Sequence, residues 1–202
     1  MRISLETNLD KAIQQIDAIC RPDQIAFAMS KALNATATEV RDEVRRNIPG
    51  RFTLRRNWIV TGIQVKKWAN KRDLEAIVWS RDRFMDLQET GGTKDPIGNY
   101  LAIPSRLVRR TPKDLVRKAD KPRSLGDRAS IVEYKGNKFL ALKNPRKAAN
   151  GQRLRFMYLL VPRASMKERL KLHDDARRVI AQRFPINLQA AIAAAMRTAR
   201  RA

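Results

Sequence analysis

The stretch LQETGGTKDPIGNYLAIP, residues 87–104, is the densest in turn-forming residues and ends in a short apolar segment. A phosphate-binding P-loop would need Gly-x-x-x-x-Gly-Lys-Ser/Thr before a helix, and here both the spacing and the helix are missing, since Pro96 and a Gly-Asn turn intervene. Its paired glycines instead permit positive φ or close approach of another backbone. We interpret the stretch as a turn that feeds a sheet edge and contacts a neighbouring subunit, with an ordinary surface hairpin as the alternative. The candidate subunit-contact residues are Gln88, Glu89, Gly91, Gly92 and Thr93.

Apolar residues at helical spacing predict two helices before this stretch. Asn8 is the expected cap of the first, whose stripe runs from Leu9 to Ile19. The second is expected to begin near Pro22 and to stop at Pro49-Gly50. Its predicted apolar stripe consists of Ile25, Met29, Leu33, Thr36, Val40 and Val44.

Strand patterns occupy the middle of the chain. They are NWIVTGIQVKKW (57–68), LEAIVWS (74–80), YLAIP (100–104), SIVEYKGNKFLALK (130–143) and LRFMYLLVP (154–162). The first two are expected to pair, and the fourth is expected to be a hairpin with Gly136-Asn137 at its turn. The patterns predict a mainly antiparallel sheet of about five short strands.

Two further helices are predicted at the C-terminal end. Ser165 and Glu168 have the spacing of a capping box, Ser-x-x-Glu, at the start of the first. Pro185 is expected to end it, and residues 187–202 then form the second. We therefore predict an α+β fold in which N-terminal and C-terminal helix pairs cover the sheet, within a single domain spanning residues 1–202.

Positive charge is the strongest compositional signal. Lys and Arg number 43 against 20 Asp and Glu, which gives a net charge of +23. Such an excess opposes compactness unless a polyanion or acidic neighbouring subunits neutralise it. Residues 105–128 form a long basic segment that we expect to be an irregular insertion or arm. The polyanion-contact candidates are Arg106, Arg109, Arg110, Lys113, Arg117 and Lys118, with Arg200 and Arg201 as second choice.

Catalytic signals are weak throughout the sequence. His173 is the only histidine and is expected to be a core or interface residue, and the single cysteine, Cys20, is expected to be an inert buried thiol. We predict no catalytic residues, no metal site and no cofactor, with a nuclease using Glu89, Asp95 and Asp86 as an alternative. Apolar runs are too short to span a bilayer and no secretory signal opens the chain, so we expect synthesis in the cytoplasm and no membrane contact.

Several segments together resemble a known family. They are IPGRFTLRRNWIVTGIQV (48–65), DLQETGGTKDP (86–96) followed by YLAIP, FMYLLVPRASMKERLKLHDDARRVIAQRF (156–184) and the alanine-rich end. This succession resembles the tail-completion and neck proteins of long-tailed bacteriophages, including the lambda-type minor tail protein Z group and related head–tail joining proteins. The basic segment 105–128 departs from the smaller members of that group.

The resemblance implies a virion structural protein without catalytic residues. Such a protein forms a homo-oligomeric ring, typically sixfold, at the head-proximal end of the tail, around the channel for genomic double-stranded DNA. Its implied partners are tail terminator, tail tube or head–tail connector proteins, and its implied location is the virion. The alternative is a cytosolic protein that binds nucleic acid independently of sequence, by backbone contacts.

The charge of such a ring would exceed what DNA can neutralise. A ring about 40 Å tall encloses roughly 24 phosphates of duplex. Six copies at +23 carry about 138 positive charges. We therefore expect a minority of the basic residues to face DNA and the rest to meet acidic surfaces of neighbouring proteins.

Overall fold

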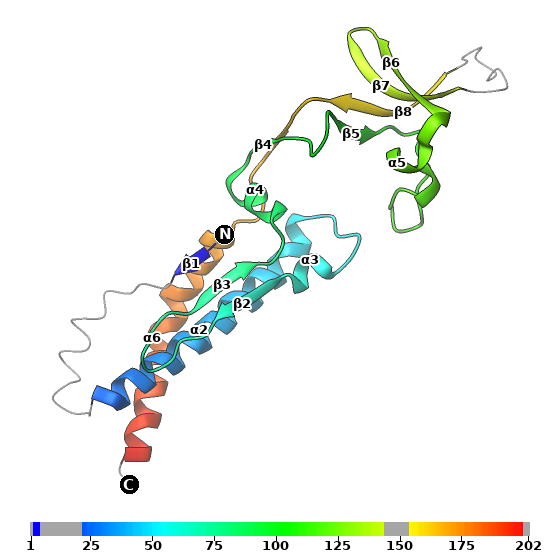
Figure 1. The fold of residues 1–202 in the computed structure, drawn as a ribbon. Helices are drawn as coiled ribbons and strands as arrows, with labels where there is room; N and C mark the ends of the chain where they lie inside the picture. The colour runs from blue at the N-terminus through cyan, green and yellow to red at the C-terminus, as the bar shows by residue number, and fades with distance from the viewer. Residues whose placement is uncertain (1, 5–21, 144–153, 200–202) are drawn as a thin grey trace. The chain divides into compact units, whose positions relative to one another are not determined.

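The computed structural model describes residues 2–4, 22–143 and 154–199, and its contacts divide the chain into two compact units (Figure 1). Unit 1 comprises Met1–Thr90 with Glu168–Ala202, and unit 2 comprises Gly91–Lys167. Helices and antiparallel sheets are both present, so the expected α+β class is confirmed. The expected single domain stays a prediction, because compact units of one chain need not be independent domains.

Unit 1 contains two long helices and a three-stranded antiparallel sheet of order β1-β3-β2. Its elements are β1 (Arg2–Ser4), α2 (Pro22–Arg51), α3 (Trp58–Thr61), β2 (Ile63–Lys67), β3 (Ile77–Ser80), α4 (Phe84–Thr90) and α6 (Leu172–Ala199). In Figure 1, α2 and α6 run side by side along the sheet. The helix expected around residues 8–19 lies outside the described residues.

The apolar stripe predicted for the second helix forms the centre of the unit 1 core. All six of its members, from Ile25 to Val44, are buried in α2. Its five apolar members pack with Leu172 and Val179 of α6 and with Ile63 of the sheet. Burying a side chain of this size contributes about 1.5–3 kcal/mol, so this stripe supplies much of the stability of unit 1. The helix continues through the expected stop at Pro49-Gly50 and ends one residue later, at Arg51, because a proline in the last turn forfeits only one hydrogen bond.

The predicted break at Pro185 is wrong, because α6 is one helix with this proline inside it. A proline inside a helix costs about 3 kcal/mol. Contacts with α2 on both sides of Pro185 offset that cost. Phe184 is buried in the core, and Asn187 donates a hydrogen bond from Nδ2 to Thr36 Oγ1 at 3.1 Å. The C-terminal helix pair is therefore a single helix.

The predicted capping box at Ser165 and Glu168 is also wrong. Ser165 lies in a strand, β9 (Ala164–Met166), and α6 begins later, at Leu172. The spacing Ser-x-x-Glu stabilises a helix start only where the following residues are helical, and here the strand pairing of residues 164–166 prevails over it.

Unit 2 is built mainly of antiparallel strands. Its elements are β4 (Gly92–Lys94), β5 (Leu101–Pro104), η1 (Lys118–Asp120), α5 (Pro122–Leu125), η2 (Gly126–Arg128), β6 (Ala129–Tyr134), β7 (Asn137–Lys143), β8 (Leu154–Val161) and β9. One sheet has the order β5-β8-β7-β6, and β4 pairs with β9 in a second. Within the described residues the strands thus form three separate antiparallel sheets instead of the single sheet of about five strands that was expected.

Two local strand predictions need correction. Residues 58–61, expected to begin a strand, form α3, and β2 starts only at Ile63. The hairpin of β6 and β7 turns at Lys135-Gly136, one residue earlier than expected, because Tyr134 pairs with Asn137. Both turn residues have positive φ, 50° and 74°, as a tight two-residue turn between twisted strands requires. The pairing of β2 with β3 and the strands over YLAIP and LRFMYLLV are confirmed.

Candidate polyanion interface

Positive charge is concentrated in unit 2. This unit holds 19 Lys and Arg against 5 Asp and Glu, a net formal charge of +14 in 77 residues. Unit 1 holds 24 against 15, a net charge of +9 in 125 residues. Basic side chains in unit 2 thus outnumber acidic ones by nearly four to one, so most of them have no acidic side chain of their own unit to pair with.

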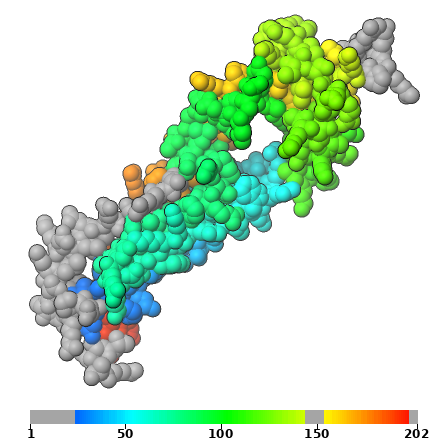
Figure 2. All heavy atoms as spheres, viewed as in Figure 1, coloured from blue at the N-terminus to red at the C-terminus, as the bar shows by residue number. Residues whose placement is uncertain are grey.

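The basic segment 105–128 covers one face of the sheet β5-β8-β7-β6. Its buried residues Val108 and Leu125 pack with Met157 and Tyr158 of β8 in the core of unit 2. Figure 2 shows the atoms of this segment, in green, gathered against the strands of the same unit. The segment is irregular, as expected, but it is a folded cover of the sheet and does not protrude as an arm.

A small hairpin within this segment carries several of the candidate residues. The backbone N–H of Arg117 donates to the carbonyl of Arg109 at 3.2 Å, and that of Thr111 donates to the carbonyl of Leu115 at 2.8 Å. Arg110 and Val116 form an isolated bridge. This pairing brings Arg109 and Arg117 together across the hairpin, with Lys113 in the connecting turn.

A buried carboxylate anchors the hairpin. Asp120 is 4% exposed and accepts hydrogen bonds from Arg109 Nε at 2.8 Å and Arg109 Nη2 at 2.9 Å. The Tyr158 hydroxyl donates to the carbonyl of Asp120 at 2.6 Å. Burial raises the pKa of Tyr158, which keeps this donor protonated. Such a forked arginine–carboxylate contact is among the stronger polar interactions in proteins, so Arg109 holds the loop in place.

The candidate residues therefore divide into two groups. Arg109 and Arg110 make ion pairs within the loop, with Asp120 and Asp114 respectively. The other four described candidates have exposed side chains and lie along the same segment. They are Arg106, Lys113, Arg117 and Lys118, which we call the basic loop set. Arg200 and Arg201 lie outside the described residues.

Low pH is expected to weaken the contact between Arg109 and Asp120 that anchors the hairpin. The hydrogen bond from Arg109 lowers the pKa of Asp120 below its usual value. A lowered folded-state pKa means that the contribution to stability is complete above the unfolded pKa of about 3.9 and is lost as pH falls through the folded value. All three tyrosines lie in unit 2, so near-ultraviolet circular dichroism from about pH 6 to about pH 2 reports this loss. An Asp120→Asn variant is expected to lack the acid transition; a variant that keeps it would contradict this assignment.

The candidate subunit-contact residues lie on either side of the boundary between the two units. In unit 1, the Gln88 carbonyl accepts hydrogen bonds from the backbone N–H groups of Arg169 and Leu170, at 2.7 and 2.9 Å. In unit 2, Thr93 lies in β4, opposite Ser165 of β9. Gly91 and Gly92 have φ of 67° and 123°, which confirms that the pair supplies positive-φ backbone.

Glu89 caps the N-terminus of α6. Its carboxylate accepts hydrogen bonds from the backbone N–H groups of Leu172 at 2.7 Å and His173 at 2.9 Å. The ring Nδ1 of His173 lies 2.7 Å from the same carboxylate, and the histidine side chain is 41% exposed, so this residue is not part of the core. A carboxylate at this position satisfies otherwise free N–H groups and complements the helix dipole.

Glu89→Gln is expected to destabilise unit 1 by about 1–2 kcal/mol, because the amide group loses the charge and places an N–H₂ opposite a backbone donor. Urea unfolding followed by tryptophan fluorescence measures this loss. Asp174→Asn, an exposed carboxylate in the first turn of the same helix, is the matched control and should change stability by less than about 0.5 kcal/mol. Equal effects of the two substitutions would show that Glu89 is not a cap.

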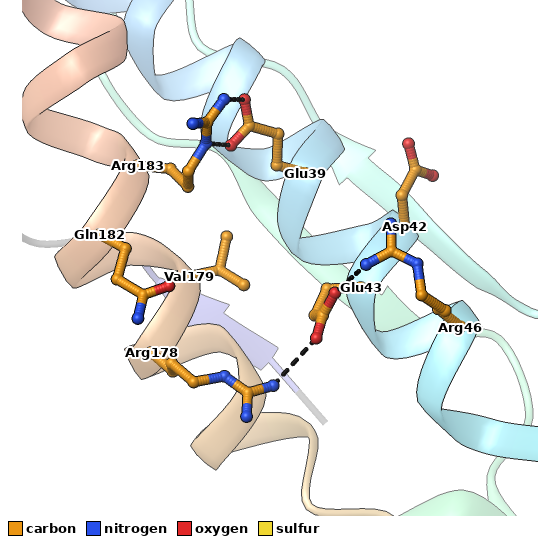
Figure 3. A pocket seen from close by; sticks show the side chains of 8 residues that line it. All are labelled: Glu39, Asp42, Glu43, Arg46, Arg178, Val179, Gln182 and Arg183. Atoms are coloured by element: carbon orange, nitrogen blue, oxygen red, sulfur yellow. Dashed lines mark hydrogen bonds and ion pairs between the residues drawn. The ribbon is translucent and has the colours of Figure 1, made fainter. Parts of the chain in front are cut away.

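A pocket of about 390 Å³ lies between α2 and α6 (Figure 3). Its charged lining is Glu39, Asp42, Glu43 and Arg46 from α2, and Arg178 and Arg183 from α6. Arg183 Nε donates to Glu39 at 2.7 Å, and Arg178 Nη2 donates to Glu43 at 3.0 Å. Arg46 also pairs with Glu43. Because these charges neutralise one another, we interpret the pocket as an ion-pair seam that aligns the two helices.

Groups suited to metal binding do not gather in the described part of the chain. There, no three His, Cys, Asp or Glu side chains lie close enough together to hold a metal ion. Glu89 is engaged at α6, and Asp95 pairs with Arg163 at 3.1 Å in unit 2. Cys20 lies outside the described residues. No helix in the described ranges is long and apolar enough to cross a membrane.

The sequence did not single out the residues that anchor the basic loop of unit 2 and the end of α2 in unit 1. Asp120 and Tyr158 anchor the basic loop, and Asp175 pairs with Arg51 in unit 1. The sequence indicates only that acidic residues are few among many basic ones, which favours ion pairs. Which cation each one meets depends on the tertiary fold.

The fold and its charge distribution define a two-unit α+β protein with a strongly basic strand-rich unit. The chain belongs to a family of unknown function, DUF6441, whose members match residues 1–157. The match includes most of unit 2 and the N-terminal part of unit 1, and it stops before α6. No curated protein and no solved structure matches the chain.

Proposed function

We propose that this protein is a structural component of a phage virion, which forms a ring at the head-proximal end of the tail in tail completion or head–tail joining. Its basic surface would face the genome channel and acidic neighbouring subunits. The observation that carries the proposal is the net charge of +14 on unit 2. That excess favours negatively charged partners. The resemblance to tail-completion and neck proteins suggests that these are genomic DNA and acidic virion proteins.

Charge arithmetic for unit 2 alone supports two kinds of partner. Six copies of this unit carry about 84 positive charges, against roughly 24 phosphates in about 40 Å of duplex DNA. DNA in a channel would neutralise a minority of that charge. The remainder fits acidic surfaces on tail terminator, tail tube or connector proteins, where complementary potentials favour association.

A strand edge in unit 2 offers a place for subunit contact. β4 is exposed at all three residues, and within the described chain it pairs with β9 alone. An unpaired strand edge presents backbone N–H and C=O groups to which a neighbouring chain can add a strand. We propose this edge as the ring contact, whereas the Glu89 carboxylate is already engaged at the N-terminus of α6.

Negative-stain microscopy of the purified full chain, alone and mixed with tail and connector proteins, tests the proposal. We expect closed rings or defined complexes with those proteins. A protein that stays monomeric or dimeric in every mixture, yet binds duplex DNA in a salt-sensitive manner, would favour the alternative of a sequence-independent nucleic-acid-binding protein. A monomer indifferent to both DNA and virion proteins would exclude both functions.

A further inference from the structure

An exposed pair of aromatic rings lies on unit 1. Trp58 of α3 and Phe84 of α4 meet edge to face, with ring centroids 5.6 Å apart and an interplanar angle of 67°. Each residue is 43% exposed. Large aromatic side chains usually bury most of their surface, so two adjacent exposed rings mark a candidate contact surface.

Two short segments of the chain meet to form this pair. Residues 55–58 read RRNW and residues 81–84 read RDRF. The backbone N–H of Arg81 donates to the carbonyl of Gly62 at 2.9 Å, which ties the second segment to the end of α3. A Cβ atom at Gly62 would lie 2.4 Å from Asp82 Oδ2, so the segments approach as closely as glycine permits.

Exposed arginines precede each ring in the sequence of both segments. The set that we call the aromatic–arginine patch consists of Arg55, Arg56, Trp58, Arg81, Arg83 and Phe84, all exposed. Two carboxylates lie within or just after the second segment. Asp82 has its Oδ2 buried near Gly62, while Asp86 is exposed on α4. Four cations against two carboxylates leave the patch positive.

We propose that the aromatic–arginine patch binds single-stranded nucleic acid. Unpaired bases would stack on Trp58 and Phe84, and the arginines would contact the phosphates. Aromatic rings next to basic groups are the two components of a sequence-tolerant single-strand site. The faces of the bases in a duplex are already stacked on one another, so duplex DNA cannot use the rings.

An acidic protein is the less suitable occupant. A stable protein interface covers about 800 Å² on each partner, with an apolar centre of many residues. The apolar part of this patch consists of two rings, which match the size of one or two bases. This site goes beyond the proposed function, because it lies in unit 1 and takes a different form of nucleic acid from the duplex expected at unit 2.

Tryptophan fluorescence of the full chain, titrated with an oligo(dT) strand of roughly 10 nucleotides, tests the proposal. We expect quenching of the wild type. Fluorescence anisotropy of a labelled strand, which does not need the tryptophan that the variant lacks, should show binding at least about tenfold weaker in a Trp58→Leu/Phe84→Leu double variant at moderate salt, where phosphate contacts are partly screened. Trp68→Leu is the matched control, since Trp68 is 50% exposed in the same unit, and its affinity should equal that of the wild type. The basic loop set in unit 2 is not expected to affect the quenching.

Either of two results with the double variant would overturn the proposal. One is oligo(dT) binding by the double variant at wild-type affinity. The other is an equal loss of polyglutamate binding in the double variant, which would assign the patch to acidic protein chains. Arg56→Gln/Arg83→Gln keeps both rings and serves where the aromatic variant fails to fold. It should make the dependence of log K on log[salt] shallower by about 1.4 for single-stranded DNA, and an unchanged slope would equally overturn the proposal.

Discussion

Asp175→Ala is expected to lower the free energy of unfolding of unit 1 by about 3 kcal/mol, the largest effect on stability among the substitutions considered. Asp175 is 2% exposed in the first turn of α6. Arg51, at the end of α2, donates to its two carboxylate oxygens at 2.6 and 2.9 Å, and Arg178 donates to one of them at 3.1 Å. Removing the carboxylate leaves the half-buried Arg51 guanidinium with only the carbonyl of Leu170, at 2.5 Å, as a partner in this cluster.

The protonation state of Asp175 explains why the loss is large at neutral pH. Burial by itself would raise the pKa of this carboxyl, but hydrogen bonds from Arg51 and Asn47 outweigh burial and lower it. The group is therefore charged at pH 7, and its contribution to stability is complete there. That contribution declines as pH falls below about 3.9 and through the lower folded-state pKa.

Urea unfolding followed by tryptophan fluorescence measures this effect in unit 1 alone, because Trp58, Trp68 and Trp79 all belong to that unit. Asp42→Ala is the matched control. Asp42 pairs with Arg41 at 2.8 Å, but its side chain is 46% exposed, and an exposed pair contributes about 0–1 kcal/mol. A loss of less than about 1 kcal/mol in Asp175→Ala would show that solvent reaches Arg51 and that the pair is not a buried one.

Replacing the basic loop set with serine is expected to weaken duplex DNA binding up to roughly 10³-fold at about 0.1 M salt. Each phosphate contact contributes about 0.9 to the slope of log K against log[salt], so four contacts should make the slope shallower by about 3–4. Arg109 and Arg110 stay in place in this variant, because their ion pairs with Asp120 and Asp114 maintain the loop. The fold of unit 2 is thus preserved while the exposed cations are removed.

A control variant that loses the same number of charges distinguishes an effect of the basic loop set from an effect of the net charge. Four exposed basic residues of unit 1 are replaced with serine in the control, which changes the formal charge by the same amount. They are Lys31, Lys66, Lys71 and Arg72. Fluorescence anisotropy of labelled duplex DNA over a series of salt concentrations gives both slopes. Equal slope changes in the two variants would mean that DNA responds to overall charge, and the assignment of residues 105–128 would fail.

Local patterns in the sequence predicted the helices and strands wherever one element buries one continuous stripe. The stripe from Ile25 to Val44 is an example, since residues three or four apart share a helix face whatever the rest of the fold. Prediction failed where distant contacts prevailed over a local signal. Pro185 predicts a break, yet packing of Phe184 and bonding of Asn187 against α2 keep the helix continuous.

The sequence predicted which basic residues make up the candidate site. It did not predict the contacts that hold them in place. The density of Arg and Lys over residues 105–128 is visible in the sequence, and four of its candidates are exposed. Asp120 has no local feature that distinguishes it from the other carboxylates of the segment. Its role follows from Arg109 and Tyr158, of which the second is 38 residues away.

The sequence by itself determined the net charge of +23, the α+β class and the positions of most strands, because charge is additive and periodicity is local. Only the tertiary structure decided that unit 2 holds most of the excess charge, that Glu89 caps α6 and that Trp58 meets Phe84. Each of these depends on residues that are far apart in the chain. Their meeting depends on how the whole chain packs, which no local pattern encodes.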